Sequence, residues 1–279
     1  MTQTRMAYMP LATYPEVVED ESILAAASFA ASLESTLNVM TFSVDIPRVS
    51  PPLTSLFVDI PGHVRAAEEK SKAECDRLQG LVQGTAASRP DVHCTSREVV
   101  LGAVLDAAAA AARYFDLAVL PWSREMVAAQ HMIEAVVFGS GRPTILVPSS
   151  ARPATVDHIA IAWDASRVAA RALGDALPLL AEGGRVSVLT VRDEKPLGGS
   201  DLAHVLAASL EKRGFNAAPL EITLGERTIA KALQDTALSQ GVQVLAMGGF
   251  GHSRIRDFVL GGATKGVFAD LRLPVLLAH

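Results

Sequence analysis

The sequence predicts an α/β protein built from two doubly wound parallel five-stranded sheets, one in each half of the chain. Short β-rich runs alternate with helical segments throughout, and the alternation of the first half is repeated in the second. Aromatic residues make up only 5% of the chain, although 49% of it is hydrophobic. Cores of Ala, Val and Leu suit helices packed on a sheet.

The first half carries the less regular version of this pattern. A Pro-rich connection over 47–61 precedes a long helix, and the glycines at 139 and 141 follow the last helix, where they are typical of a helix C-cap. Strands are predicted at 6–11, 37–44, 92–97, 116–122 and 144–148, and helices at 17–33, 63–83, 98–113 and 124–138.

The second half carries the clearer version. Apolar residues recur at helical spacing over 166–180, and Gly183 and Gly184 end that segment. Strands are predicted at 158–163, 185–191, 218–224, 242–247 and 274–278, and helices at 166–180, 201–215, 227–240 and 262–270. Strands joined by crossover helices run parallel, so each half is expected to form a doubly wound sheet.

A short polar segment, PSSARPAT at 148–155, marks the expected boundary between domains at 1–150 and 151–279. Each half ends in an apolar strand, TILVP or PVLLA. An exposed apolar strand edge invites aggregation. We therefore expect the two halves to pair through these last strands as an intramolecular pseudo-dimer, with a homodimer of the whole chain left open.

The charge and the cysteine content indicate a cytoplasmic protein. A net charge of −5 argues against a nucleic-acid partner, which would call for a basic face. Cys75 and Cys94 lie in different predicted elements without metal-ligand spacing, which is typical of reduced thiols. No signal-peptide pattern is visible, and no apolar run reaches the roughly 18 residues of a membrane span. We expect no membrane partner.

The most informative stretch is GGFGHSRIRDFVLGG at 248–262, directly after the predicted strand at 242–247. Glycine lets a ligand approach backbone N–H groups without a Cβ in the way. A glycine loop between a strand and a helix is a common phosphate cradle. The alternative is a pair of ordinary turns.

This stretch, followed by ATKGVF and LPVLLAH, resembles the C-terminal signature of the universal stress protein family, G-x2-G-x9-G-[ST] before a helix and a Pro-Val strand. Gly248, Gly251 and Gly261 stand at the required spacing. The resemblance covers 153–279, and the duplicated chain looks like a tandem universal stress protein with two Rossmann-like domains. In nucleotide-binding members the loop and the following helix hold the phosphates of ATP, and an Asp after the first strand contacts the adenosine. Asp164 occupies that place here.

The strand ends should bring the candidate site together, because parallel sheets bind ligands beyond the carboxyl ends of their strands. Asp164 can accept hydrogen bonds from adenine or ribose, or else cap the next helix. Thr264 matches the family's hydroxyl residue, or is an ordinary helix residue. The candidate nucleotide-binding residues are Asp164, Val191, Met247, Gly248, Gly251, His252, Gly261, Gly262, Ala263 and Thr264.

Two departures from the family pattern qualify this site. Gly262 replaces the Ser or Thr that follows the third glycine, so one hydroxyl contact is lost. In the first half, Ala12 and Thr13 stand near the place of the Asp, and the loop after 122 is shorter and lacks the leading glycines. The first half is therefore read as a degenerate domain without a phosphate site.

Sequence motifs for catalysis are absent: there is no G-x-S-x-G, H-E-x-x-H or Walker A pattern, and the seven histidines form no metal-binding pair. Enzyme activity is left undecided, at most slow ATP hydrolysis. The predicted function is a stress-response protein that binds ATP or a related adenine nucleotide, with or without Mg²⁺, in its C-terminal domain, as a nucleotide-responsive regulatory or interaction module. The alternative is an interaction module that binds no nucleotide and acts on a protein partner through its surface alone.

Overall fold

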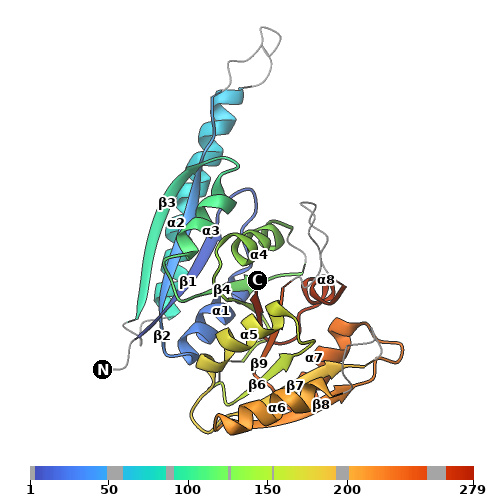
Figure 1. Ribbon diagram of the computed structural model, residues 1–279. Helices are drawn as coiled ribbons and strands as arrows, with labels where there is room; N and C mark the ends of the chain where they lie inside the picture. Colours follow the sequence, from blue (N-terminus) through green and yellow to red (C-terminus); the bar gives the residue numbers. More distant parts are fainter. Residues whose placement is uncertain are drawn as a thin grey trace.

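The described residues form one continuous sheet of ten strands (Figure 1). The computed structural model describes residues 4–48, 59–85, 91–124, 127–152, 154–192, 201–249 and 262–279. The strands are β1 (Arg5–Ala12), β2 (Ser35–Asp45), β3 (Val92–Val100), β4 (Leu117–Trp122), β5 (Thr144–Pro148), β6 (His158–Ala162), β7 (Arg185–Val191), β8 (Asn216–Ile222), β9 (Val244–Gly248) and β10 (Val275–Ala278). Their order across the sheet is β3-β2-β1-β4-β5-β10-β9-β6-β7-β8.

Each half contributes five mutually parallel strands, which confirms the predicted fold class. In the first half β1 lies between β2 and β4, and in the second half β6 lies between β7 and β9. The chain thus winds outward from the first strand in both directions. Each half therefore has a topological switch point beside its first strand.

The two halves join through their last strands, as predicted. β5 and β10 run antiparallel, with Leu146 opposite Val275 and Ile145 opposite Leu276. The two five-stranded sheets are therefore the halves of a single ten-stranded sheet. A second link comes from Trp122 at the end of β4, whose indole Nε1–H donates to the carbonyl oxygen of Phe268 at 3.3 Å.

The helices form two layers, one on each face of the sheet. They are α1 (Asp20–Ser32), α2 (Ile60–Thr85), α3 (Val104–Ala112), α4 (Val127–Gly139), α5 (Arg167–Ala176), α6 (Leu202–Lys212), α7 (Ile229–Ser239) and α8 (Gly262–Ala269), with a 3-10 turn at Leu177–Leu179. One buried cluster packs α1, α2, α5 and α6 on the sheet, and the other packs α3, α4, α7 and α8. Both clusters include residues of both halves.

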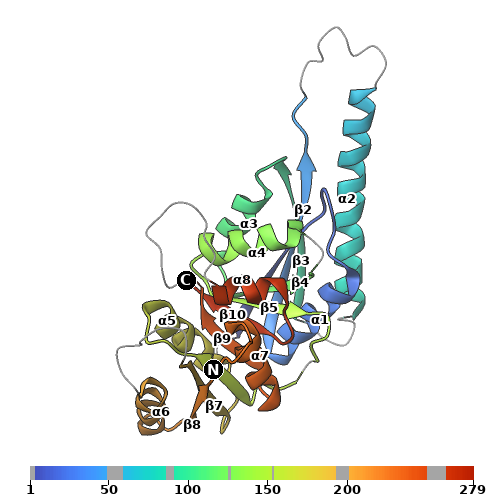
Figure 2. The same ribbon diagram turned by 90° about the vertical axis from the view of Figure 1, so that its right-hand side faces the viewer.

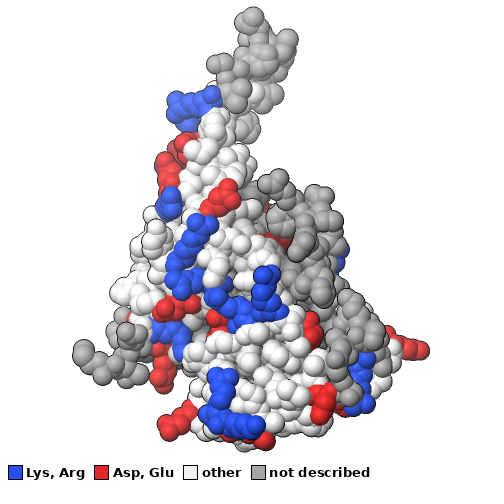
Figure 3. Space-filling model, viewed as in Figure 1, with Lys and Arg blue, Asp and Glu red and all other residues white. Residues whose placement is uncertain are grey.

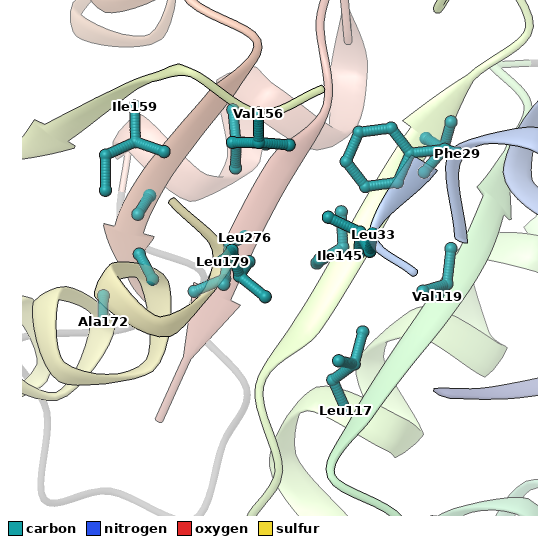
Figure 4. Packing of buried hydrophobic residues seen from close by; sticks show 14 of the residues in the cluster. Phe29, Leu33, Leu117, Val119, Ile145, Val156, Ile159, Ala172, Leu179 and Leu276 are labelled. Carbon is teal, nitrogen blue, oxygen red and sulfur yellow. The ribbon is translucent and has the colours of Figure 1, made fainter. Parts of the chain in front are cut away.

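One face of the junction lies in the first of these clusters and the other face in the second. Figure 4 shows Leu33 beside Ile145 of β5, and Leu179 beside Leu276 of β10. Ile145 and Leu276 are both fully buried. Because β5 and β10 have neighbours on both sides and helices above and below, neither apolar strand leaves an exposed edge.

Some boundaries differ from the sequence-based predictions. The predicted helix at 98–113 begins only at Val104, because 98–100 continue β3 and pair with β2 as far as Val100 opposite Asp45. The helix predicted at 166–180 ends at Ala176, and a 3-10 turn containing Pro178 follows. Proline has no backbone N–H to continue the α-helical hydrogen bonds.

Helix α2 is the longest described helix, with 26 residues. Together with the ends of β2 and β3 it projects away from the rest of the protein (Figures 1 and 2). Among the described helices, including this one, none is both long and apolar enough to cross a membrane.

His158 at the start of β6 is a buried polar link between two strands. It is 3% exposed, and its Nε2 lies 2.8 Å from the hydroxyl oxygen of Ser187 in β7. Burial lowers the pKa of His158, and the positive charge of Arg185 acts in the same direction. The ring is therefore neutral in the folded protein near neutral pH.

Replacing Ile145 by alanine tests the cooperativity of the two halves. Removing a buried aliphatic side chain of this size typically costs about 2–5 kcal/mol. We expect denaturant unfolding of Ile145→Ala to remain a single transition, shifted for both halves, because the strand belongs to a shared sheet and a shared cluster. Leu238→Ala, at a position 39% exposed, should change stability far less. Two separate transitions, with only one shifted, would contradict a continuous sheet.

A pH titration of stability tests the state of His158. An unfolded histidine with its ordinary pKa of 6.5 binds a proton that the folded state does not accept, so the free energy of unfolding should decrease as the pH falls below about 6.5. His158→Gln should remove much of this decrease, whereas His131→Gln, at an exposed position, should retain it. Equal pH profiles for the wild type and His158→Gln would show that His158 does not couple folding to pH.

Candidate functional site

Asp164 lies just beyond the carboxyl end of β6, between the ends of β7 and β9. The residue before it is fixed to β7: the Trp163 N–H donates to the Leu189 carbonyl at 2.7 Å, and the Thr190 hydroxyl donates to the Trp163 carbonyl at 3.1 Å. On its other side β6 pairs with β9 as far as Ile161 opposite Ala246. This position is the topological switch point of the second half.

The carboxylate of Asp164 is exposed and only partly used. Its Oδ1 accepts a hydrogen bond from the Ser166 N–H at 2.9 Å. Oδ2 accepts no hydrogen bond within the part of the chain that the structure describes. The alternative role of Asp164 as helix cap is wrong, because the N-cap of α5 is Ser166, whose hydroxyl accepts from the Ala169 N–H at 3.2 Å. Asp164 therefore presents an oxygen to solvent at the switch point.

Val191 is the last residue of β7, and Met247 is the last but one of β9. Both side chains belong to the core. They are 8% and 3% exposed and belong to the second buried cluster. Only their backbone groups are available to a ligand at this edge. Sequence reasoning placed both residues at the edge and could not tell that their side chains point inward.

Gly248 has a packing role of its own. A Cβ added there would lie 2.6 Å from Cγ2 of Val168 and 2.9 Å from the backbone N of Ala169. The start of α5 thus lies directly against the end of β9, and only glycine permits this approach. The next residue, Gly249, donates its N–H to the Ala278 carbonyl at 2.8 Å, which continues the β9–β10 pairing.

The glycine loop itself is only partly described. Gly251, His252 and Gly261 lie outside the described residues. Gly262 opens α8, Ala263 is half-buried, and the Thr264 side chain is 3% exposed. The structure therefore brings Asp164, Val191, Met247 and Gly248 to one edge of the sheet and places Thr264 within the protein.

The corresponding place in the first half, between the ends of β1 and β4, is narrow. Between the ends of β1 and β4 the space amounts to about 20 Å³, lined mainly by apolar residues such as Leu11, Leu120 and Met132. That is room for about one water molecule. Thr13, near the place of the aspartate, is 5% exposed; it donates to the Phe42 carbonyl at 2.8 Å and lies 2.6 Å from the Ser71 hydroxyl. It ties β1 to β2 and α2, and it also lines a separate groove of about 650 Å³ together with Tyr14, Glu16, Lys70 and Ser71.

A groove beside the site was not predicted from the sequence. It has a volume of about 370 Å³ and is lined by Arg167, Val168, Arg171 and His279. Val168 is also the residue that Gly248 packs against, so the groove adjoins the end of β9. The spacing of the two arginines, one helical turn apart just after Asp164, was the available signal.

Residues 155–279 match the model of the universal stress protein family. This half of the chain is therefore a universal stress protein domain, in agreement with the glycine spacing. None of the curated proteins compared matches the sequence.

Solved structures extend the similarity to the whole chain. A universal stress protein from Archaeoglobus fulgidus DSM 4304 aligns with a TM-score of 0.69 at 16% identity, over 97% of this chain and 97% of that chain. A protein from Pseudomonas aeruginosa UCBPP-PA14 has a TM-score of 0.55 at 14% identity, over 98% and 93%. A functionally unknown protein from Pseudomonas aeruginosa PAO1 has a TM-score of 0.50 at 14% identity, over 97% and 92%. The whole chain therefore has a fold found in universal stress proteins, consistent with two such domains in tandem.

Two glycine-to-alanine substitutions distinguish a glycine needed for close packing from one that is not. Gly248→Ala should lower the free energy of unfolding by about 1–3 kcal/mol, because the new methyl group would collide with the backbone at Val168 and Ala169. Gly174→Ala is the matched control, since it lies within α5 with nothing near the added Cβ, and it should raise stability by about 0.5–1 kcal/mol. Both values are measured by denaturant unfolding without ligand. If Gly248→Ala were as stable as the wild type, the glycine would not be needed for packing.

Proposed function

We propose that this protein binds ATP or a related adenine nucleotide at the edge formed by the ends of β6, β7 and β9, and that binding regulates its contacts with a protein partner. The observation that carries the proposal is the exposed, partly unused carboxylate of Asp164 at the switch point. Ligands of doubly wound sheets bind at this position. The family match over 155–279 and the glycine spacing support the same site.

Different residues would contact the adenosine and the phosphates of the nucleotide. Asp164 would accept hydrogen bonds from the ribose hydroxyls or the adenine amine, and the backbone at Val191 and Met247 would border the base. The N–H groups of Gly251, Gly261, Gly262 and Ala263 would donate to phosphate oxygens, as glycine loops before a helix commonly do. His252 would add positive charge when protonated, and Thr264 would donate its hydroxyl if α8 adjusts to expose it.

Mg²⁺ would reach this site together with the nucleotide. Magnesium in nucleotide sites is held largely by phosphate oxygens and water, with few protein carboxylates. The described residues contain no group of three or more acidic, histidine or cysteine side chains that could hold a metal by themselves.

The alternative is an interaction module without nucleotide, and one observation favours it. Gly248 is required by the contact with α5 whether or not a ligand binds, so one of the three signature glycines has a purely structural explanation. The missing hydroxyl at Gly262 points the same way. Titration with nucleotide decides between the two proposals.

Asp164→Ala tests the proposed adenosine contact. A hydrogen bond to a charged group contributes about 1.5–3 kcal/mol, so ATP affinity measured by titration calorimetry should fall by roughly tenfold to a hundredfold. Asp106→Ala removes an exposed carboxylate from α3 in the other half and should leave the affinity unchanged. Equal affinities for the wild type and Asp164→Ala would remove Asp164 from the site, and absence of ATP binding by the wild type would favour the alternative.

A further inference from the structure

The groove beside Gly248 is lined by basic side chains from two elements of the second half. Arg167 and Arg171 lie one turn apart on α5, Val168 lies beside them, and His279 follows the end of β10. The volume of about 370 Å³ can hold more than one phosphate group. None of the described residues that line it is acidic.

Arg171 is held in place by contacts that leave part of its guanidinium available. Its Nε donates to Oδ2 of Asp175 at 2.7 Å, and its Nη2 donates to the Gly141 carbonyl at 3.4 Å. These contacts use two of the five N–H donors of the group. Arg167 makes no hydrogen bond or ion pair with the described residues, and its side chain is exposed.

The ring of His279 is positioned by two further contacts. Its Nδ1 lies 3.1 Å from the Gly249 carbonyl, and the ring meets that of Phe138 edge to face with 5.2 Å between centroids. The ring therefore stays beside the end of β9.

The basic surface continues across the junction into the first half. Both Nε and Nη2 of Arg142 donate to the Arg113 carbonyl, and the same atoms of Arg113 donate to the Gly139 carbonyl. Arg142 directly follows Gly141, whose carbonyl oxygen accepts the hydrogen bond from Arg171. Figure 3 shows basic side chains gathered in a band across the middle of this face. In a chain of net charge −5 such a band is a local attraction for anions.

We propose that Arg167 and Arg171 bind the terminal phosphates of the nucleotide, so that the site selects adenosine polyphosphates over the monophosphate. This inference rests on the proposed function. A nucleotide with its adenosine at Asp164 and its phosphates running past Gly248 would direct the end of its phosphate chain toward the groove. Guanidinium groups are well suited to such a ligand, because their N–H donors match two phosphate oxygens at once.

Nucleotide selectivity tests the proposal. Dissociation constants for ATP and AMP are measured by calorimetry for the wild type, for Arg167→Gln/Arg171→Gln and for Lys212→Gln/Arg213→Gln. The last variant removes the same charge from the end of α6. Exposed positions on α5 should tolerate glutamine, and unchanged thermal unfolding confirms that the variants fold. We expect the α5 variant to lose about tenfold or more in ATP affinity with little change for AMP, and the α6 variant to bind both like the wild type.

The other outcomes are distinguishable. Equal weakening of ATP and AMP by the α5 variant, or an equal loss of ATP affinity in the α6 variant, overturns the assignment of the arginines while the nucleotide site stands. If the wild type binds neither ATP nor AMP, the proposed function and this inference both fail.

Discussion

Three residue pairs between β5 and β10, Leu146 with Val275, Ile145 with Leu276 and Thr144 with Leu277, set the arrangement of everything else in the molecule. Both strands are fully buried, and each is the last strand of its half. An isolated half would expose an apolar edge and unpaired backbone groups, which is unfavourable in water. Antiparallel pairing within one chain removes both edges at once.

The same pairing decides what surrounds the candidate site. Because the halves meet antiparallel, the carboxyl ends of the strands in the second half lie beside the amino end of β5 in the first half. This is why Arg171 of α5 reaches the Gly141 carbonyl, and why Arg142 lies close to the groove. The first half thus borders the candidate site of the second half, although the space between the ends of its own β1 and β4 is small. The two halves share a fold but differ in the residue near the end of the first strand. Thr13 is buried and hydrogen-bonded, whereas Asp164 is exposed.

Much of the fold could be predicted from the sequence, because periodicity and turn residues are local signals. The strand number, the parallel direction and the pairing of TILVP with PVLLA are all confirmed. The start of α3 was wrong, since residues 98–100 join β3 only through their pairing with β2. The packing role of Gly248 was also beyond prediction, since it depends on how closely α5 lies against β9. For the site, strand ends could be placed, but the inward side chains of Val191 and Met247 and the groove at His279 arise from contacts between distant segments.

The number of ATP molecules bound per chain tests the central claim most directly, because that claim is an asymmetry between two halves of one fold. Equilibrium titration of the full chain with ATP should reach saturation at one nucleotide per chain, since the second half has Asp164 after its first strand and the signature glycines, whereas the first half has Ala12 and Thr13 at the place of the aspartate and lacks the leading glycines. Two equivalent sites per chain would contradict the account, because the first half would then bind ATP without the aspartate and the glycine spacing on which the proposed site depends.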